Sequence, residues 1–342
     1  MDKRVIFAVA GSGKTTEVIS RLSLDKRALI VTYTENNYEH LRNKVIKKFG
    51  YMPRNITVLT YFAFLHGFCY RPLLQSKLST NGLYFKQPPD SAPRARDKLA
   101  HYRHRSGKLY YNRLAKLLEQ TNAHPDVIAR LERFYDNMFV DEVQDFAGND
   151  FNLLIALSKA NVEMLLVGDF YQHTFDTSRD GNINCSLHDD IVKYEKRFQA
   201  AGFTVDKTSL GKSWRCGTTV CDFIRANLNI DIHAQADRHT EIINVETQAV
   251  ADQLHADPNI VKLFYQTHHQ YGCHSKNWGA SKGLDHYNDV CIVMGTTHWN
   301  HYQNGKLHEV KPQTKNKLYV ACSRARGNLY LVHEKFFKAY KH

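Results

Sequence analysis

The sequence of 342 residues lacks any uninterrupted apolar run long enough to span a membrane, and no signal-peptide core precedes its first strand pattern. It also lacks internal repeats and low-complexity tracts. Its seven cysteines are scattered without a CxxC pair, which favours reduced thiols over a disulfide framework. We therefore expect a cytoplasmic protein with no membrane partner.

The composition is that of a globular protein, with 43% hydrophobic and 23% charged residues, and the length allows two domains with separate cores. The formal net charge is +12. An anionic partner, with nucleic acid as the first candidate, fits this charge, and a generally basic protein fits it nearly as well.

Apolar strand patterns alternate with amphipathic helix patterns through the first half of the chain. The helix pattern over 35–49 carries Leu41, Val45 and Ile46 at helical spacing. The strand patterns cover 4–10, 28–34, 55–61, 138–142 and 162–169. This alternation predicts an α/β fold with a mostly parallel sheet covered on both faces.

A second α/β series begins near Asp206. Its helix patterns cover 218–228 and 317–325, and its strand patterns cover 242–245, 260–265, 290–294 and 329–333. We therefore predict two domains, 1–205 and 206–342. The region of about 72–130 mixes helical patches with proline and charged runs, and the sheet pattern resumes after it, so we predict a small, mostly helical insertion in the first domain.

The segment AVAGSGKT (8–15) matches a phosphate-binding loop except that Ala8 replaces the first glycine. Glycines let backbone N–H groups close around a phosphate at a helix N-terminus, the lysine reaches the β- and γ-phosphates, and the threonine hydroxyl holds Mg²⁺. A plain glycine turn is the alternative, and the strand–loop–helix context argues against it. The predicted nucleotide contacts are Gly11, Ser12, Gly13, Lys14, Thr15 and Thr16.

Two further strand ends carry polar groups that suit NTP hydrolysis. In FVDEVQD (139–145), Asp141 would bind Mg²⁺ together with Thr15, and Glu142 would orient or deprotonate the attacking water. In LLVGDFYQ (165–172), the amide of Gln172 suits a group that senses the γ-phosphate. Each pattern alone is weak, and their combination with a phosphate loop favours the functional interpretation.

These motifs, with others in the second half, resemble the UvrD/Rep-like helicases of superfamily 1. The further matching segments are VTYTENN (31–37), VLTYFAF (58–64), SWRC (213–216), NWGASKGLDHYNDVCIVM (277–294) and LYVACSRARGNLYLV (318–332). The resemblance implies two RecA-like domains with parallel sheets, with ATP and Mg²⁺ in the cleft between them. It also implies that Arg215 and Arg324 approach the γ-phosphate, that Trp214 lies beside the base, and that Gly283 and Asp285 line the nucleotide site.

By the same resemblance, Tyr33, Tyr61 and Phe62 occupy positions that contact single-stranded DNA. Aromatic faces stack on any base, which gives sequence-tolerant binding. Core packing at a strand end is an equally good interpretation of these rings. The segment 94–116 carries eight Lys and Arg residues and predicts a basic helical face for phosphate contact or a solvated helix.

The sequence departs from the family pattern at several points. The first strand begins at Arg4, which leaves no room for the segment whose glutamine reads adenine. Thr177 stands where the family has a DNA-stacking tryptophan, and Gly279 where a DNA-contacting histidine is common. The accessory insertions are also small, as expected for a compact member. HHQYGCH (268–274) offers candidate metal ligands at a spacing more typical of an ordinary loop.

The sequence therefore predicts a Mg²⁺-dependent ATPase of the UvrD-like helicase type that binds single-stranded DNA. It would translocate 3′ to 5′ or unwind, as the motor of a repair or anti-phage (antiviral) defence complex with a nuclease or another protein partner. The alternative is a nucleotide-switched binding module that gates assembly of such a partner without processive unwinding. A viral-type RNA helicase is a third interpretation.

Overall fold

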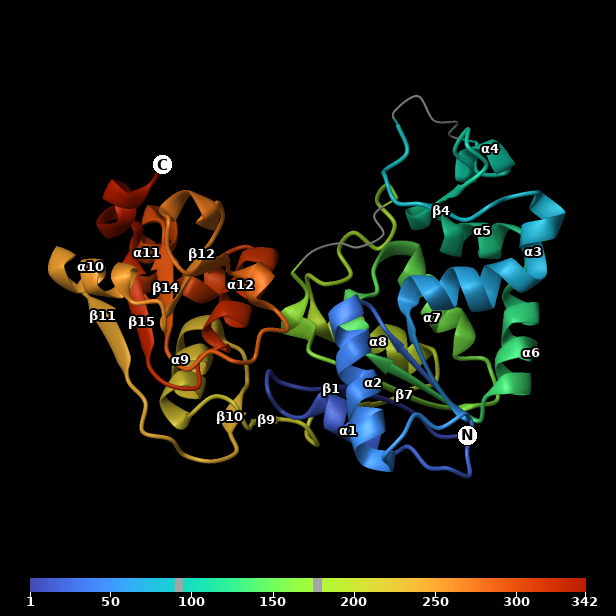
Figure 1. Cartoon of the computed structure of the whole chain (residues 1–342), viewed down its shortest axis with the longest axis horizontal. Coiled ribbons are helices and arrows are strands. Elements are labelled where there is room, and N and C mark those ends of the chain that lie inside the picture. Colours follow the sequence, from blue (N-terminus) through green and yellow to red (C-terminus); the bar gives the residue numbers. More distant parts are fainter. Residues whose placement is uncertain (90–94, 175–179) are drawn as a thin grey trace. The chain divides into compact units, whose positions relative to one another are not determined.

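The computed structural model describes residues 1–89, 95–174 and 180–342, and its chain forms two compact units (Figure 1). The first unit contains Met1–Ile6, Thr15–Gly168 and the segment that ends at Asp206. The second contains Phe7–Lys14, the segment that begins at Asp169, and Lys207–His342. The sequence predicts the phosphate loop and the segment after Gly168 in the first domain, whereas both pack mainly with the second unit.

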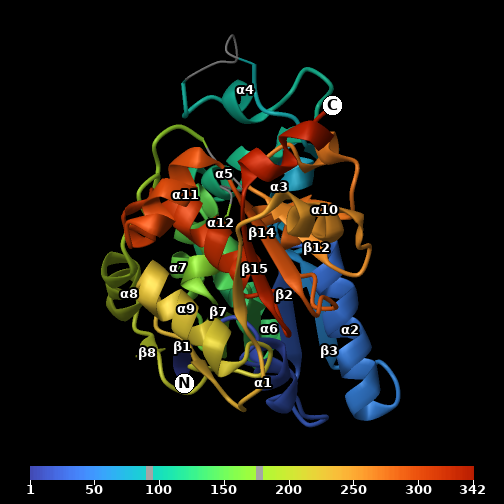
Figure 2. The same cartoon turned by 90° about the vertical axis from the view of Figure 1, so that its left-hand side faces the viewer.

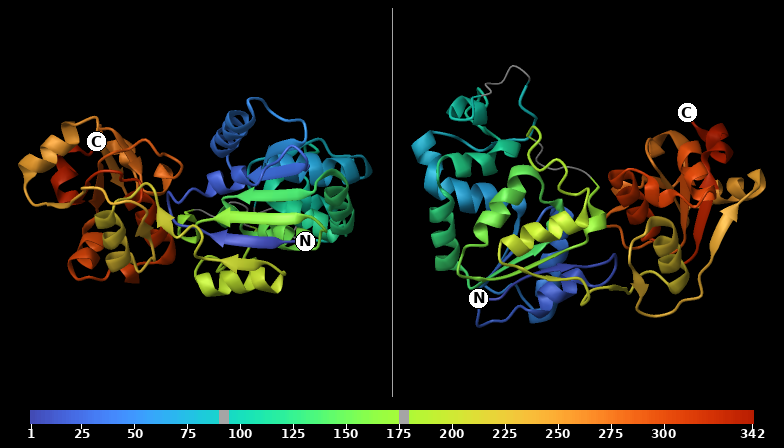
Figure 3. Two further views of the ribbon diagram at one scale, coloured as in Figure 1. Left: turned by 90° about the horizontal axis from the view of Figure 1, so that it is seen from below. Right: turned by 180° about the vertical axis from the view of Figure 1, so that it is seen from behind.

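The first unit is built on a six-stranded sheet, in which the pairs β2–β3, β2–β6, β6–β7 and β1–β8 are parallel. Its order is β3 (Ile56–Thr60), β2 (Ala28–Thr32), β6 (Asn137–Asp141), β7 (Glu163–Gly168), β1 (Lys3–Phe7) and β8 (Thr204–Asp206). Figure 3 shows these strands running in one direction. The strands that precede the phosphate loop, DEVQD and GDFYQ therefore end at one edge of the sheet.

Helices and short turns complete the first unit. They are α1 (Lys14–Ser20), α2 (Glu35–Phe49), η1 (Ala63–Tyr70), α3 (Arg71–Leu78), α4 (Leu99–Tyr102), η2 (Tyr111–Arg113), α5 (Leu114–Gln120), α6 (His124–Phe134), η3 (Val143–Asp145), α7 (Gly148–Leu157) and α8 (Ile191–Ala200). The sequence sets the ends of α2 locally, because the Thr34 side chain accepts from the backbone N–H of Asn37 and Gly50 ends the helix at φ 80°. The predicted insertion is mostly helical and adds one short parallel pair, β4 (Leu83–Tyr84) with β5 (Leu109–Tyr110).

The second unit is built on a five-stranded parallel sheet. Its order is β11 (Ile242–Val245), β15 (Leu329–His333), β14 (Val290–Met294), β12 (Val261–Phe264) and β13 (Ser275–Asn277). Side chains alternate between its faces, so Val290 and Ile292 join one buried cluster while Cys291 and Val293 join another. Figure 2 shows helices on both sides of this sheet.

One face of the second sheet is covered by α9 (Thr218–Leu228) and α12 (Pro312–Cys322), and the other by α10 (Gln248–Ala256) and η8 (Glu334–Tyr340). The remaining elements are η4 (Phe170–Gln172), β9 (Lys212–Ser213), β10 (His233–Ala234), η5 (His268–Tyr271), η6 (Gly279–Ser281), α11 (Thr296–Gln303) and η7 (Leu307–Glu309).

The predicted α/β class with two separate sheets of parallel strands is confirmed. Five of the nine predicted strand ranges are two residues longer than the strands themselves, and the other four have the same length. The sequence prediction misses β8 and β13, which are only three residues long. Within the described residues, no helix is long and apolar enough to cross a membrane. All seven cysteines are free thiols.

Candidate functional site

The phosphate-loop sequence adopts a cradle that only glycine permits. Gly11 and Gly13 have φ values of +71° and +97°, in the left-handed region that disfavours side chains. The hydroxyl of Ser12 is buried without a hydrogen-bond partner. Lys14 is 9% exposed and forms no hydrogen bond or ion pair within the part of the chain that the structure describes. A buried hydroxyl without a hydrogen-bond partner and a buried cation without a hydrogen bond or close ion pair fit an anionic ligand such as a nucleotide phosphate.

The loop packs directly against the SWRC segment. The backbone N–H of Trp214 donates to the carbonyl of Gly11 at 2.9 Å. A Cβ atom built on Gly11 would lie 2.7 Å from Cβ of Arg215 and 3.0 Å from Oγ of Ser213. Glycine at position 11 is therefore required by the close approach of Arg215 as well as by its backbone conformation.

Thr15 and Asp141 meet in the first unit. The Thr15 hydroxyl donates to Oδ2 of Asp141 at 3.1 Å, and Asp141 is 2% exposed. A hydroxyl and a carboxylate oxygen at this separation are two of the oxygen ligands that Mg²⁺ prefers. The sequence predicts both residues as metal ligands, and their geometry fits that role.

Glu142, the residue after β6, has an unusual backbone. Its φ is 60° and its ψ is 49°, a left-handed conformation that is uncommon for residues other than glycine, asparagine and aspartate. Its backbone N–H donates to Oδ1 of Asp141 at 3.1 Å, and the Gln144 amide donates to its carboxylate Oε2. Strained backbone held in place by neighbours is typical of catalytic positions.

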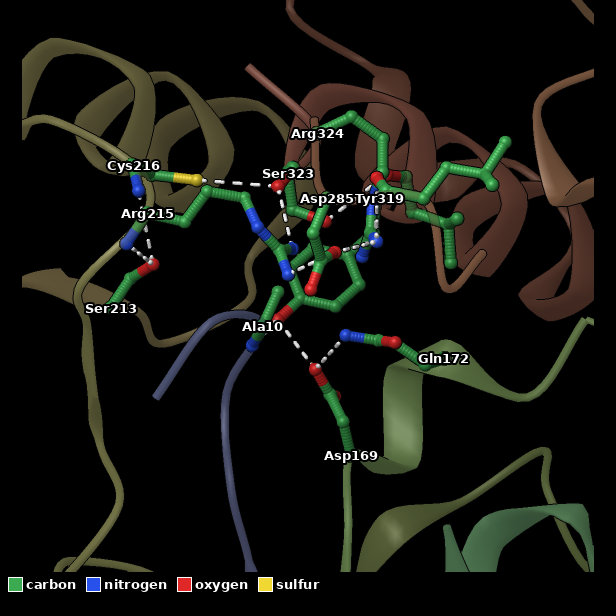
Figure 4. Close-up of polar contacts among 12 residues, drawn as sticks. Ala10, Asp169, Gln172, Ser213, Arg215, Cys216, Asp285, Tyr319, Ser323 and Arg324 are labelled. Carbon is green, nitrogen blue, oxygen red and sulfur yellow. Dashed lines mark hydrogen bonds and ion pairs between the residues drawn. The ribbon is translucent and has the colours of Figure 1, made fainter. Parts of the chain in front are cut away.

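The two predicted arginines converge on one carboxylate of the second unit (Figure 4). Nη2 of Arg215 and Nη1 of Arg324 lie 2.5 Å and 3.0 Å from Oδ1 of Asp285. Burial disfavours the charged carboxylate, but the attraction of both arginines outweighs it and lowers the pKa of Asp285. Arg324 is 2% exposed, and burial together with the repulsion of Arg215 lowers its pKa to about 10, so it stays a cation at neutral pH.

Gln172 belongs to a second hydrogen-bond network in the same unit. Its Nε2 donates to Oδ2 of Asp169 at 2.9 Å. The Tyr319 hydroxyl donates to the same oxygen at 2.8 Å, and it accepts from the backbone N–H of Ala10 at 2.9 Å (Figure 4). Asp169 and Tyr319 lie inside the sequence motifs but are not among the predicted site residues, because no sequence pattern shows where a side chain points.

The other predicted nucleotide contacts lie at the surface or near it. Trp214 is 61% exposed, and its carbonyl accepts from Arg238 at 2.8 Å. The Thr16 hydroxyl accepts from Lys44 at 3.2 Å. Gly283 has a φ of +80° with open space around it. An exposed indole next to the phosphate loop is free to stack on a base.

The predicted nucleic-acid rings form one aromatic cluster in the first unit. The rings of Tyr33 and Tyr61 stack at 5.5 Å between centroids, and Phe62 contacts both edgewise or tilted. Tyr61 is 1% exposed, so its faces are covered by protein. Phe62 also contacts Phe85 at 5.5 Å, and Phe85 is 62% exposed. Sequence reasoning missed Phe85, because a single phenylalanine in an irregular segment carries no periodic signal.

The segment 94–116 does not form the single basic helical face that its composition predicts. It contains the short helix α4, the strand β5, the turn η2 and only the start of α5, while residues 90–94 lie outside the described chain. Nε of Arg113 lies 3.1 Å from Oδ1 of Asp180, and its Nη1 donates to the carbonyl of His101. Ser106 and Gly107, the latter with a φ of +81°, interrupt the helical pattern within this segment.

Three further positions that the sequence singles out remain. Among the described residues, no group of three His, Cys, Asp or Glu residues that could hold a metal occurs. The first four residues of HHQYGCH form the turn η5. Thr177 lies outside the described residues. Gly279 packs against Thr174 and Lys317, where a Cβ atom would lie 3.3 Å from each.

No family model and no curated protein matches this sequence. Among solved structures, the chain is similar to arterivirus nonstructural protein 10, a helicase, in its complex with DNA, with 16% identity and a TM-score of 0.49. The similarity covers 98% of this chain and 61% of the viral chain, so the chain spans less than two thirds of that protein. The UvrD/Rep-like subfamily stays a prediction.

Proposed function

We propose that this protein is a Mg²⁺-dependent ATPase that acts on single-stranded nucleic acid. The observation that carries this proposal is the 3.1 Å hydrogen bond between the Thr15 hydroxyl and the Asp141 carboxylate. These are the two protein groups that hold Mg²⁺ in phosphate-loop NTPases. Thr15 and Asp141 would hold the ion, which would neutralise the negative charge that develops during phosphoryl transfer.

The chain's own residues divide the remaining tasks. The backbone around Gly11 and Gly13 receives the phosphates, and Lys14 supplies a buried positive charge. Glu142 accepts the proton of the attacking water, with its carboxylate fixed by Gln144. Arg215 and Arg324 stabilise negative charge on the transferred phosphoryl group, which contributes more to phosphoryl transfer than covalent chemistry does.

Nucleic acid would lie across the aromatic cluster of the first unit. Phe85 offers an exposed ring, and Phe62 is half-buried beside it. Because every base has a π-face, such rings bind single strands with little sequence preference. The net charge of +12 supports binding to an anionic polymer. We assign DNA as the polymer and 3′ to 5′ as the direction on the UvrD-like motifs, with a nuclease as the partner of so compact a motor in repair or anti-phage defence.

A nucleotide-switched module is the second candidate, and the burial of Tyr61 favours it. A ring that is 1% exposed offers no stacking face until the aromatic cluster opens. In this candidate, hydrolysis changes which protein partner binds, and no movement along a strand occurs.

ATP hydrolysis measured at one stated salt concentration separates the two candidates. The four conditions are no polymer, single-stranded DNA, duplex DNA and single-stranded RNA. Strong stimulation by single-stranded DNA supports the motor, and stimulation by RNA alone supports the viral-type RNA helicase. Equal rates in all four conditions, with ATP-dependent capture of a protein partner, support the switch.

A further inference from the structure

Tyr319 places a single hydroxyl between two loops. It lies in α12 and is 0% exposed. A backbone N–H can only donate, so the hydrogen bond from Ala10 occupies a lone pair of the phenol oxygen. The phenol proton is therefore directed to Asp169. Burial, followed by the nearby Asp169 charge, raises the pKa of Tyr319 well above its usual value, so the hydroxyl keeps this proton at any physiological pH.

The first of these loops carries Gln172. Asp169 accepts from Tyr319 and from Nε2 of Gln172 through the same oxygen, while its Oδ1 accepts from the backbone N–H of Tyr171 at 3.1 Å. The Gln172 amide is thus held in one orientation by a carboxylate that Tyr319 itself orients. The second loop is the phosphate loop, which Tyr319 contacts at Ala10.

The backbone of Tyr319 leads to the arginines. Its carbonyl accepts from the N–H of Ser323 at 2.9 Å, and the Ser323 carbonyl accepts from Nη1 of Arg215 at 3.1 Å. Arg324 follows directly in the chain. Tyr319 therefore bonds directly to the phosphate loop. It is connected to Gln172 through Asp169 and to Arg215 through Ser323 (Figure 4).

We infer that Tyr319 is a positioning residue, whose hydroxyl holds the phosphate loop and the Gln172 amide in the relative position that hydrolysis requires. The inference rests on the proposed function, because it assigns a role within the same site. Tyr319 touches no reacting atom, so its hydroxyl contributes to turnover more than to nucleotide binding. A purely structural tyrosine would contribute through its ring, which also lies against Tyr171 at 6.1 Å.

The variant Tyr319→Phe tests this, because it keeps the ring and removes only the hydroxyl. Tyr271→Phe is the matched control: Tyr271 is 1% exposed in the same unit, and its hydroxyl donates to the Glu334 carboxylate at 2.6 Å. We expect kcat for ATP to fall roughly tenfold to a hundredfold in Y319F, as for loss of a hydrogen bond to a charged group. We expect KM to change less than about threefold, and Y271F to keep the wild-type kcat.

A wild-type kcat in Y319F, an equal loss in Y271F, or a loss that appears only in KM would overturn the inference while leaving the ATPase intact. A wild-type protein that hydrolyses no ATP would overturn the proposed function first. If Y319F does not fold, as judged by its thermal unfolding, Asp169→Asn removes the shared acceptor charge at constant size. The same fall in kcat is then expected, and an unchanged kcat in D169N would contradict the inference.

Discussion

Arg215 binds Asp285 with 2.5 Å between Nη2 and Oδ1, and the same oxygen also binds Arg324 at 3.0 Å. One carboxylate oxygen therefore holds two cations that repel each other. A buried guanidinium such as that of Arg324 needs a counter-ion, and Asp285 supplies it. An incoming phosphate would compete with this carboxylate for the same two arginines.

We predict that Asp285→Asn strengthens binding of inorganic phosphate. The amide is neutral, so both arginines lose their counter-ion and attract another anion more strongly. The melting temperature should fall in phosphate-free buffer and rise with added phosphate more steeply than in the wild type. Asp231→Asn, which removes an exposed carboxylate beside His233, is the control. Identical phosphate dependence in wild type and D285N would contradict this prediction.

The acid side of the stability profile should also depend on Asp285. Its folded-state pKa is lowered below the unfolded value of about 3.9. The stability that this carboxylate contributes is therefore fully present above the unfolded pKa and is lost as pH falls through the lowered folded pKa. Urea unfolding between neutral pH and about pH 3 should show a smaller acid loss in D285N than in wild type. Parallel curves would show that the pKa of Asp285 is not lowered by the arginines.

Gly11→Ala should impair nucleotide binding by two effects, a side chain at φ +71° and a collision with Arg215. Gly305→Ala separates them, because Gly305 has a similar φ of +68° with open space around it. Both variants should lose about 1 kcal/mol of stability from backbone strain. Only G11A should also lose nucleotide affinity, at least roughly tenfold in a binding titration, since 1.4 kcal/mol corresponds to that factor. A wild-type nucleotide affinity in G11A would show that the phosphate loop does not bind the nucleotide.

Phe85→Ala should weaken binding of a single-stranded oligonucleotide by roughly fivefold to a hundredfold, the usual effect of losing one stacked base at about 1–3 kcal/mol. Phe134→Ala is the matched control, because Phe134 is also exposed in the first unit but packs against Arg130 and Arg133. Fluorescence anisotropy at fixed salt measures both. Equal affinities in wild type and F85A would exclude Phe85 from the nucleic-acid surface.

The sequence predicts the fold and the glycine conformations of the phosphate loop well, because local patterns encode them. Strand alternation and the helix ends at Thr34 and Gly50 are set by neighbouring residues. The glycines of the phosphate loop predict a backbone with positive φ, which other residues rarely adopt. The bond between Thr15 and Asp141 could be anticipated because Asp141 ends strand β6 and Thr15 lies in α1, which follows strand β1 of the same sheet.

Contacts between distant segments could not be predicted in this way. The shared carboxylate of Asp285 and the bridging hydroxyl of Tyr319 depend on side-chain directions that a single sequence does not reveal. The prediction of a basic helical face over 94–116 is wrong for another reason. Charge composition does not determine secondary structure, and Arg113 forms an ion pair with Asp180.

Hydrolysis at the site that contains Thr15 and Asp141 is tested most directly by the release of phosphate from ATP with and without Mg²⁺. We expect Mg²⁺-dependent release by the wild type. The rate should fall by at least about a hundredfold in Lys14→Ala and Glu142→Gln, and it should be unchanged in Lys47→Ala, which alters an exposed lysine of α2. Wild-type rates in K14A or E142Q, or release that ignores Mg²⁺, would contradict hydrolysis at this site.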